Sequence, residues 1–356
     1  MTHISEFDYE LPQELIAQTP VEPRDSSRLM VVDRENAAID TGRAFRDIAD
    51  LLNPGDVLVL NTTRVVPARI PAIKPTGGAA EILLLRQLAP TRWNALVGGK
   101  NIAVGMQLSF ANSTLTATIV EDLSGAERVV EFSEPPGSHL AQIGQTPLPP
   151  YIHTPVSDPE RYQTVYARQE GSAAAPTAGL HFTPDLLIEL RRKGVVFAHC
   201  TLHIGLDTFQ PVKVETIEDH EIHSEYAELS TQDAEIINKA KLAGGRIVAV
   251  GTTSARTLET AALVSAGGDP QHPEESMDLC PWRPVAAFTA DTRLFITPGY
   301  RWKAVDALVT NFHLPKSTLL MMISSFAGLD LTRKAYATAI AERFRFYSFG
   351  DAMFIM

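Results

Sequence analysis

RIVAVGTTSARTLE, residues Arg246–Glu259, contains the clearest strand–turn–helix pattern in the chain. Its first half is a short apolar run that ends at a glycine, which predicts a buried strand. Gly-Thr-Thr-Ser predicts a turn, and SARTLETAALV predicts a helix. A strand that passes through a small polar turn into a helix is typical of α/β proteins.

The same alternation recurs on both sides of this stretch. Strands are expected in RLMVVDR, DVLVLN, VVFAHCTLHI and DALVTNF. Helices are expected in LPQELIAQ, FRDIADLL, Pro184–Lys193, Thr231–Ala243, STLLMMISSFAG and LTRKAYATAIAERF. Together these segments predict one mixed α/β domain, with a loop-like, solvent-exposed excursion at Gly267–Pro284.

Between about Arg64 and Pro147 the pattern changes. Short β-rich runs such as RIPAIK, AEILLLRQL and LTATIVED alternate with Gly, Pro, Asn and Ser turns, which predicts a small all-β barrel or sandwich. The simplest architecture is therefore a larger mixed α/β, barrel-like domain, formed by residues 1–62 and 149–356, with a small all-β barrel inserted at 63–148.

Composition places the 356-residue chain among ordinary soluble globular proteins, since 45% of its residues are hydrophobic and 21% are charged. The amino terminus has no signal-peptide pattern, and the apolar runs are shorter than a membrane helix requires, so a cytoplasmic location is expected. Cys200 and Cys280 lack zinc-like spacing and are expected to be reduced thiols. A net charge of −11 means that a nucleic-acid partner would need a local basic patch.

Four polar segments carry the reactive side chains. They are APTAGLHFT (Ala175–Thr183), TLHIGLDTF (Thr201–Phe209), AVGTTSARTLE (Ala249–Glu259) and TNFHLPKST (Thr310–Thr318). Small residues, hydroxyls, histidines and an arginine at strand ends suit a pocket built from loops on a rigid scaffold. The segments therefore point to an enzyme.

Three histidines, His181, His203 and His313, lie in equivalent strand-end positions. A single such histidine is more often structural, but three together favour proton transfer, because imidazole titrates near neutral pH. His220 and His223 lie in a charged segment without an H-E-x-x-H pattern, so a metal site is not expected there.

The Gly-Thr-Thr-Ser turn is an expected anion site. The amides and dipole of a helix start attract a phosphate or carboxylate, and Arg256 could clamp it beside Thr252 and Thr253. The alternative is a capped helix without a ligand. Dinucleotide, P-loop and serine-hydrolase motifs do not occur. The residues alone thus predict an acid–base enzyme with an anion-binding turn, no metal and no redox cofactor.

Nearly the whole chain resembles one family. The segments that carry the resemblance include FDYELPQELIAQTP, NTTRVVPAR, PLPPYI, AAPTAGLHFT, TLHIGLDTFQPV, HEIHSEYAEL, RIVAVGTTSARTLE, DALVTNFHLPKSTLLM and RFRFYSFGDAMFI. In this order they resemble the S-adenosylmethionine:tRNA ribosyltransferase-isomerases of the queuosine pathway. Asp207 departs from the Gly-rich loop of that family and would add charge near His203. The excursion at Gly267–Pro284 also looks longer than usual.

The resemblance implies a larger α/β domain with an inserted β barrel, and a defined reaction. Such an enzyme transfers and isomerises the ribosyl group of S-adenosylmethionine onto 7-aminomethyl-7-deazaguanine in a tRNA anticodon. The products are epoxyqueuosine-tRNA, adenine and methionine. S-adenosylmethionine is thus the ribosyl-donor substrate, and tRNA is the partner. No metal, redox cofactor or membrane is implied, and a monomer is favoured.

Site roles follow as expectations. Acid–base candidates are His181, His203 and His313. Substrate-binding candidates are Thr177, Thr252, Thr253, Arg256, Asn311, Ser317 and Asp351. Candidates for tRNA phosphates are Arg24, Arg28, Arg64 and Arg345. Tyr347 could stack a base but suits core packing better, and Asp351 could pair with an arginine or hold a substrate ammonium.

Two other functions stay open at this point. The chain could be a non-catalytic RNA- or nucleotide-binding protein that has kept the fold, or a methyltransferase. Release of adenine from S-adenosylmethionine in the presence of tRNA separates the three. A methyltransferase would leave S-adenosylhomocysteine, and a binding protein would leave S-adenosylmethionine intact.

Overall fold

The computed structural model describes residues 2–123, 125–154, 156, 158–205, 212 and 214–356. The chain divides into two compact units. The larger unit contains residues 1–63, 149–169 and 175–356, and the smaller contains 64–148 and 170–174. The predicted α/β fold with an inserted all-β barrel is confirmed. Asp207 lies outside the described residues.

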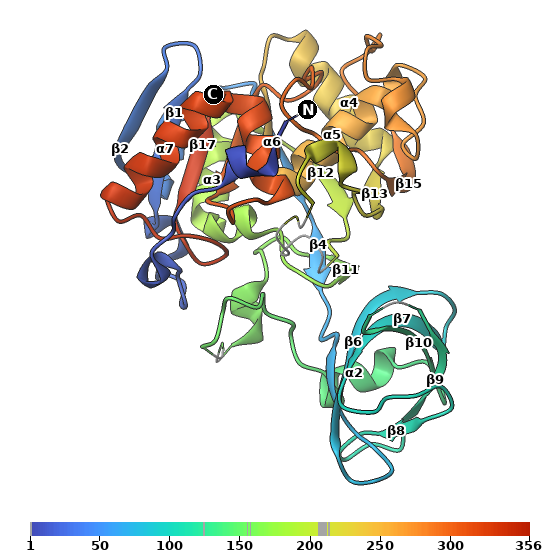
Figure 1. Ribbon diagram of the computed structural model, residues 1–356. Helices are drawn as coiled ribbons and strands as arrows, with labels where there is room; N and C mark the ends of the chain where they lie inside the picture. Colours follow the sequence, from blue (N-terminus) through green and yellow to red (C-terminus); the bar gives the residue numbers. More distant parts are fainter. Residues whose placement is uncertain (1, 124, 155, 157, 206–211, 213) are drawn as a thin grey trace. The chain divides into compact units, whose positions relative to one another are not determined.

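The larger unit is built on a nine-stranded mixed sheet (Figure 1). In spatial order the strands are β15 (Phe288–Thr292), β13 (Glu225–Leu229), β12 (Val196–Leu202), β3 (Val57–Asn61), β14 (Ile247–Val250), β16 (Ala307–Asn311), β17 (Ala352–Ile355), β1 (Arg28–Asp33) and β2 (Ala38–Ala44). Strands β12, β3, β14 and β16 run parallel to one another. Their carboxyl ends therefore meet at one edge of the sheet, where α/β proteins commonly bind ligands.

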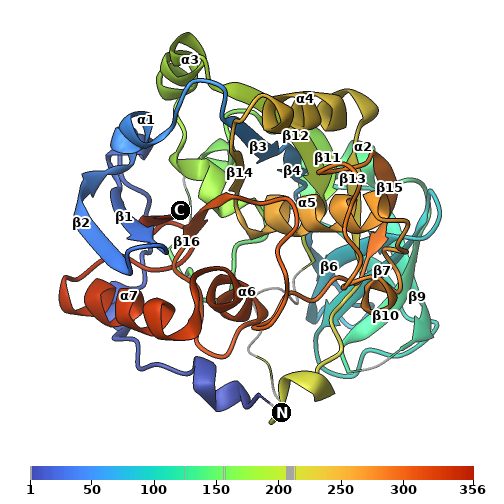
Figure 2. The same ribbon diagram turned by 90° about the horizontal axis from the view of Figure 1, so that it is seen from above.

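Helices cover both faces of this sheet (Figure 2). They are α1 (Ile48–Leu51), α3 (Pro184–Lys193), α4 (Thr231–Leu242), α5 (Thr252–Ser265), α6 (Thr318–Ala327) and α7 (Leu329–Ala341). Alternate strand residues face opposite layers: Val57 and Val59 pack in the core with α4 to α7, whereas Leu58 and Leu60 pack with α1 and α3. Burial on both faces explains why these strands are apolar runs without alternation.

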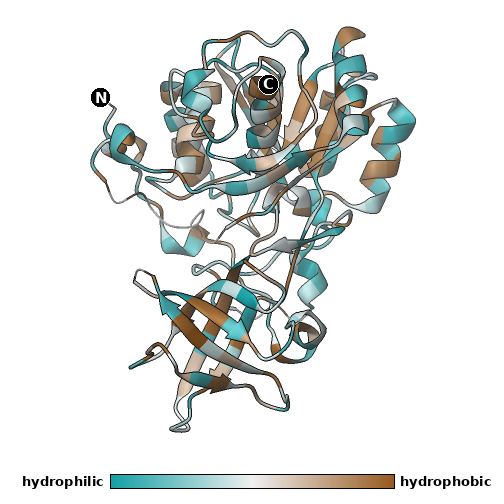
Figure 3. Ribbon diagram, turned by 90° about the vertical axis from the view of Figure 1, so that its right-hand side faces the viewer, coloured by the Kyte–Doolittle hydropathy of each residue, from teal (hydrophilic) through white to brown (hydrophobic). Residues whose placement is uncertain are grey.

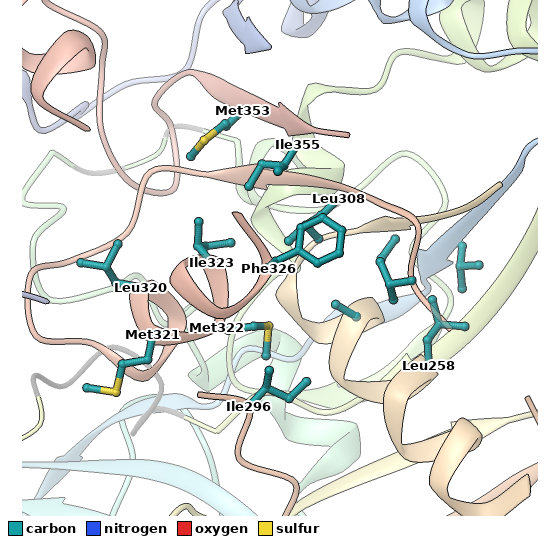
Figure 4. Close-up of a cluster of buried hydrophobic side chains, with 14 of the residues drawn as sticks. Leu258, Ile296, Leu308, Leu320, Met321, Met322, Ile323, Phe326, Met353 and Ile355 are labelled. Atoms are coloured by element: carbon teal, nitrogen blue, oxygen red, sulfur yellow. The ribbon is translucent and has the colours of Figure 1, made fainter. Parts of the chain in front are cut away.

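The core under α6 shows how the larger layer is filled (Figure 4). Leu320, Met321 and Ile323 of α6 belong to one cluster with Leu308 of β16 and Ile355 of β17. All five side chains are buried. Burying a side chain of this size contributes about 1.5–3 kcal/mol, so this cluster fixes α6 against the sheet.

The smaller unit is a closed antiparallel barrel. Its strands, in order, are β10 (Glu127–Phe132), β7 (Arg92–Gly98), β6 (Ala79–Gln87), β5 (Arg69–Ile73), β8 (Gln107–Ser109) and β9 (Thr116–Asp122). The barrel strands carry both hydrophilic and hydrophobic stretches (Figure 3). In β9, Ala117 and Ile119 are fully buried while their neighbours are not, which is the period of two expected of a barrel wall. Helix α2 (Gly137–Ile143) follows the barrel, and β4 (Thr63–Val65) pairs with β11 (Gln169–Ser172).

One helix prediction is wrong. LPQELIAQ forms only a single 3-10 turn, Gln13–Leu15, rather than an amphipathic helix. The reason is a long-range pairing: the amide of Ala17 donates to the carbonyl of Phe346, and the amide of Phe346 donates to Leu15. These backbone groups are used by a partner more than 300 residues away in the chain, so they are not available to a helix. In FRDIADLL, the expected helix is shared between a 3-10 turn, Phe45–Asp47, and α1.

Candidate functional site

A pocket opens at the carboxyl ends of β14 and β16 in the larger unit. Its volume is about 620 Å³ when measured to the open mouth. The lining comes from six parts of the chain: Tyr151; Ala175–Ala178; Ile204; Gly251–Thr253; Thr310–Leu314 with Ser317 and Leu319; and Tyr347 with Ser348. All four polar segments of the sequence therefore reach this pocket, and TLHIGLDTF contributes Ile204 from its described part.

The amino end of α5 forms one wall. Gly251, at φ +89°, precedes the helix and gives it no side-chain cap. Within the described ranges, the hydroxyl of Thr253 is buried and has no hydrogen-bond partner. The first amides of a helix also lack intrahelical acceptors and carry the positive end of the helix dipole. This wall is thus prepared for an anion or another acceptor.

The three histidines take different positions. His313 lines the pocket, and its Nε2 lies 2.7 Å from the hydroxyl of Thr310. His181 is buried behind the lining, where its Nδ1 lies 2.7 Å from the Ser27 hydroxyl. His203 precedes the lining residue Ile204 and lies 2.8 Å, through Nδ1, from the hydroxyl of Thr63. The structure brings one of the three into the pocket wall.

Burial keeps these histidines neutral. It lowers the pKa of His181 to about 3, helped by the positive charges of Arg345, Arg161 and Arg24. Burial also lowers the pKa of His313 to about 3, and it lowers the pKa of His203, which Glu228 partly opposes. Because a lowered pKa favours the uncharged ring, all three are neutral near neutral pH and hold no proton to give as imidazolium.

A hydrogen-bonded chain connects the pocket to His181. The 3-10 turn Thr177–His181 places its first residue in the lining and its last residue in the interior. Both meet Asn311 at the end of β16: the hydroxyl of Thr177 is 3.1 Å from Oδ1, and Nε2 of His181 is 3.1 Å from Nδ2. Two predicted substrate-binding residues, Thr177 and Asn311, are therefore adjacent in the wall.

Arg256 does not line the pocket. It lies one turn further along α5, where its guanidinium forms a buried ion pair with Glu225 and donates to the carbonyls of His223 and Thr292. Ser317 does line the pocket, but it also caps α6: its hydroxyl donates to Leu314 and accepts from the amide of Leu320.

The carboxylate of Asp351 binds two backbone amides. Its two oxygens accept from the amides of Arg28, at 2.9 Å, and Arg345, at 2.8 Å. Burial raises the pKa of Asp351, which these two amides oppose. The carboxyl group holds the loop before β17 against β1, and it is not among the pocket-lining residues.

The predicted tRNA-binding arginines are divided between the units. Arg24 donates to the carbonyls of Gln163 and Glu160, and Arg345 donates to those of Thr19 and Phe349. Arg28 lies over the Phe344 ring and pairs with Glu342. These three belong to the larger unit, whereas Arg64 belongs to the smaller one.

Aromatic residues of the pocket were only partly anticipated. Tyr151 and Tyr347 both line it, and their rings lie 4.6 Å apart. Tyr347 is 5% exposed, so its side chain packs in the core and also forms part of the pocket wall. Tyr151, whose hydroxyl lies 2.8 Å from that of Ser348, was not predicted as a site residue. Its only sequence signal was the Pro-rich punctuation PLPPYI.

The described residues offer neither a metal-binding cluster nor a membrane-spanning helix. In that part of the chain, no group of three His, Cys, Asp or Glu side chains is arranged to hold a metal ion. Over the same residues, no helix has both the length and the apolar composition needed to cross a bilayer.

Comparison with known proteins gives consistent results. A family model described as "Queuosine biosynthesis protein" matches residues 4–355. The chain is 52% identical over 357 residues to the S-adenosylmethionine:tRNA ribosyltransferase-isomerase of Symbiobacterium thermophilum, with 99% of each covered. It is 38% identical to the solved S-adenosylmethionine tRNA ribosyltransferase of Thermotoga maritima, with a TM-score of 0.56 over 99% of this chain and 100% of that one.

Proposed function

The chain belongs to the S-adenosylmethionine:tRNA ribosyltransferase-isomerase family of queuosine biosynthesis, and on that premise we propose that the pocket at the carboxyl ends of β14 and β16 is its S-adenosylmethionine site. The enzyme transfers and isomerises the ribosyl group of S-adenosylmethionine onto 7-aminomethyl-7-deazaguanine in tRNA. It forms epoxyqueuosine-tRNA and releases adenine and methionine.

The observation that carries the site assignment is the open amino end of α5. The substrate has a carboxylate at one end, and a carboxylate suits uncapped helix amides and the unpaired hydroxyl of Thr253. Thr252 lines the same wall. Arg256, whose charge is already neutralised by Glu225, supports this wall from within α5 instead of clamping the ligand.

His313 is the proposed proton acceptor. The sulfonium of S-adenosylmethionine acidifies the adjacent C5′ protons, so a neutral base beside it can remove one. His313 lines the pocket, and its lowered pKa leaves the ring uncharged at neutral pH. Thr310 holds Nε2, while Nδ1 has no hydrogen-bond partner among the described residues. The substrate amine is the nucleophile, so no protein nucleophile, metal or redox cofactor enters this proposal.

The activity is tested with purified protein, S-adenosylmethionine and a tRNA carrying 7-aminomethyl-7-deazaguanine. Mass spectrometry of the digested nucleosides should show epoxyqueuosine, with free adenine and methionine in equal amounts. S-adenosylhomocysteine would indicate a methyltransferase instead. Unreacted S-adenosylmethionine, when a control enzyme is active in the same assay, would indicate a non-catalytic binding protein.

The role of His313 is tested by His313→Gln. We expect single-turnover product formation to fall by about 10²–10⁴-fold, as for loss of a general base, with S-adenosylmethionine affinity within a few-fold of wild type. His272→Gln, at an exposed histidine of the 267–284 excursion, is the matched control and should keep full activity. Unchanged turnover in His313→Gln would remove this residue from the mechanism.

tRNA binding is assigned to Arg24, Arg28, Arg64 and Arg345 as a proposal. It is supported by the need of an acidic chain for local positive charge. Arg24 and Arg345 are half-buried, and each donates to main-chain carbonyls of neighbouring loops. Each Arg→Gln variant should weaken tRNA binding at low salt and reduce the salt slope by about 1. Equal affinity and slope would exclude that arginine.

We also propose that the enzyme works as a monomer in the cytoplasm. Sedimentation with and without tRNA tests whether it is a monomer.

A further inference from the structure

The orientation of the Asn311 amide is fixed by a main-chain carbonyl. Nδ2 lies 3.2 Å from the carbonyl oxygen of Tyr347 and 3.1 Å from Nε2 of His181. A carbonyl oxygen can only accept, so the NH₂ group, and not the amide oxygen, must face Tyr347. The opposite orientation would place two oxygens against each other.

This orientation determines the tautomer of His181. Since the NH₂ group of Asn311 donates to Nε2, that nitrogen carries no proton, and the ring proton is on Nδ1. Nδ1 then donates to the Ser27 hydroxyl at 2.7 Å. The ring also stacks on Phe45, with centroids 4.9 Å apart. Both nitrogens are therefore occupied inside the protein, and neither faces the pocket.

The same orientation determines the polarity of Thr177. The Asn311 oxygen accepts from the Thr177 hydroxyl, so the single hydroxyl proton of Thr177 is committed to Asn311. Thr177 lines the pocket, and its oxygen has only lone pairs left to offer a ligand. This part of the wall can accept a hydrogen bond but cannot donate one.

We propose that His181 is a positioning residue that holds the Asn311 amide together with the Tyr347 carbonyl, and that Thr177 thereby selects a hydrogen-bond donor of the substrate. This deepens the proposed function, on which it rests. In S-adenosylmethionine, the donors are the α-ammonium, the 6-amino group of adenine and the ribose hydroxyls. His181 takes no part in proton transfer, in contrast to the role expected for it from its position in the sequence.

Histidine-selective ¹⁵N NMR tests the tautomer without any activity. The His181 signals, identified by their loss in His181→Gln, should show the Nδ1–H form unchanged from about pH 5 to 8. A proton on Nε2, or titration near the ordinary pKa of about 6.5, would overturn the proposal. The result holds even if the enzyme proves inactive, so it separates this inference from the proposed function.

Kinetics test the positioning role. A leucine at 181 cannot accept from Asn311, whereas glutamine can. His181→Leu should raise KM for S-adenosylmethionine about tenfold, and His181→Gln should restore part of it, with the shape of the kcat/KM pH profile unchanged in both. A profile that loses one limb, without rescue by glutamine, would indicate proton transfer and contradict the proposal.

Ligand analogues test Thr177. Thr177→Val keeps the shape of the side chain but removes the acceptor, and should weaken S-adenosylmethionine binding about tenfold. Calorimetry then compares S-adenosylmethionine with analogues that lack the α-amino group, the 6-amino group or a ribose hydroxyl. The donor that Thr177 takes is the one whose removal costs affinity in wild type but nothing further in Thr177→Val. If every deletion costs the same in both proteins, Thr177 selects no donor.

Discussion

The two ends of the parallel strands β3, β14 and β16 differ in how completely their polar groups are paired. At the amino ends, Asp56 accepts from the amide and guanidinium of Arg246, and Asp306 accepts from Lys241 and the amide of Ile247. At the carboxyl ends, the Thr253 hydroxyl is buried without a partner in the described structure, and α5 begins without a cap. One end of the sheet is closed by its own charges, while the other keeps polar groups that a ligand can satisfy.

The contrast between the two ends separates residues that stabilise the fold from residues that bind a ligand. Buried polar groups in native proteins are nearly always paired, so an unpaired one calls for an explanation. Ligands of α/β proteins bind beyond the carboxyl ends of the strands. We therefore expect substitutions at the amino ends to alter stability, and those at the carboxyl ends to alter binding and turnover.

The largest effect is expected at the closed end. Asp56→Ala leaves the Arg246 guanidinium in a partly buried position without its carboxylate, which should lower the free energy of unfolding by about 3–5 kcal/mol. The affinity of the remaining folded protein for S-adenosylmethionine should be unchanged. Urea unfolding and calorimetry measure the two quantities. A variant with normal stability but weak binding would reverse the assignment of the two ends.

The stability contributed by the Asp56–Arg246 ion pair should depend on pH. Burial would raise the pKa of Asp56, but the Arg246 guanidinium and the amides of Asn53 and Arg246 lower it overall. A lowered pKa contributes stability above the unfolded value of about 3.9 and loses it as pH falls through the folded value. The stability difference between wild type and Asp56→Asn should be constant from about pH 5 to 8 and shrink below about pH 4. A difference that grows in acid would contradict the ion pair.

The next largest effect is expected at the turn that joins Thr177 to His181. A Cβ at Gly179 would lie 2.1 Å from the Tyr166 hydroxyl and 2.8 Å from a methyl group of Thr164. Gly179→Ala should therefore cost about 1–3 kcal/mol and reduce turnover, because the turn must shift. Adding Tyr166→Phe removes the nearest atom and should recover part of both losses. No loss in Gly179→Ala would show that the pocket wall is less rigid than described.

The smallest effect on stability, and a clear effect on binding, is expected for Thr253→Val. Removing an unpaired buried hydroxyl should leave the stability equal to or above that of wild type. S-adenosylmethionine affinity should fall about tenfold, as for the loss of one hydrogen bond to a charged group. Thr257→Val, one turn along α5, is the control, because its hydroxyl donates to the carbonyl of Thr253 within the helix. Equal affinities of Thr253→Val and Thr257→Val for S-adenosylmethionine would show that the ligand does not bind at the amino end of α5.

Local patterns in the sequence predicted much of the fold. The helix expected at Pro184–Lys193 is α3, and in the structure the Thr183 hydroxyl caps it by accepting from the amide of Leu186. Short β-rich runs between turns predicted the barrel, and RIPAIK, AEILLLRQL and LTATIVED correspond to β5, β6 and β9. Strand β13 and its neighbour β15, at the edge of the sheet, were missed, because EYAEL and FTADT carry charges and lack a clear pattern. They exist because the sheet supplies their hydrogen bonds, which no local signal reports.

The site was less predictable for the same reason. The sequence suggested three equivalent histidines, but only His313 lines the pocket, because the 3-10 turn at Thr177–His181 directs His181 inward. Arg256 was expected to bind an anion, but Glu225, 31 residues away, neutralises it. Pairings over such distances depend on strand order and helix rotation, which single segments do not determine.

Amide hydrogen exchange with and without S-adenosylmethionine compares both ends of the sheet in one experiment, and so shows which end binds the ligand. We predict slower exchange in peptides that cover 251–255 and 311–317, and no change in those that cover 53–57 and 241–246. Protection at the amino ends, with none at the start of α5, would contradict the account.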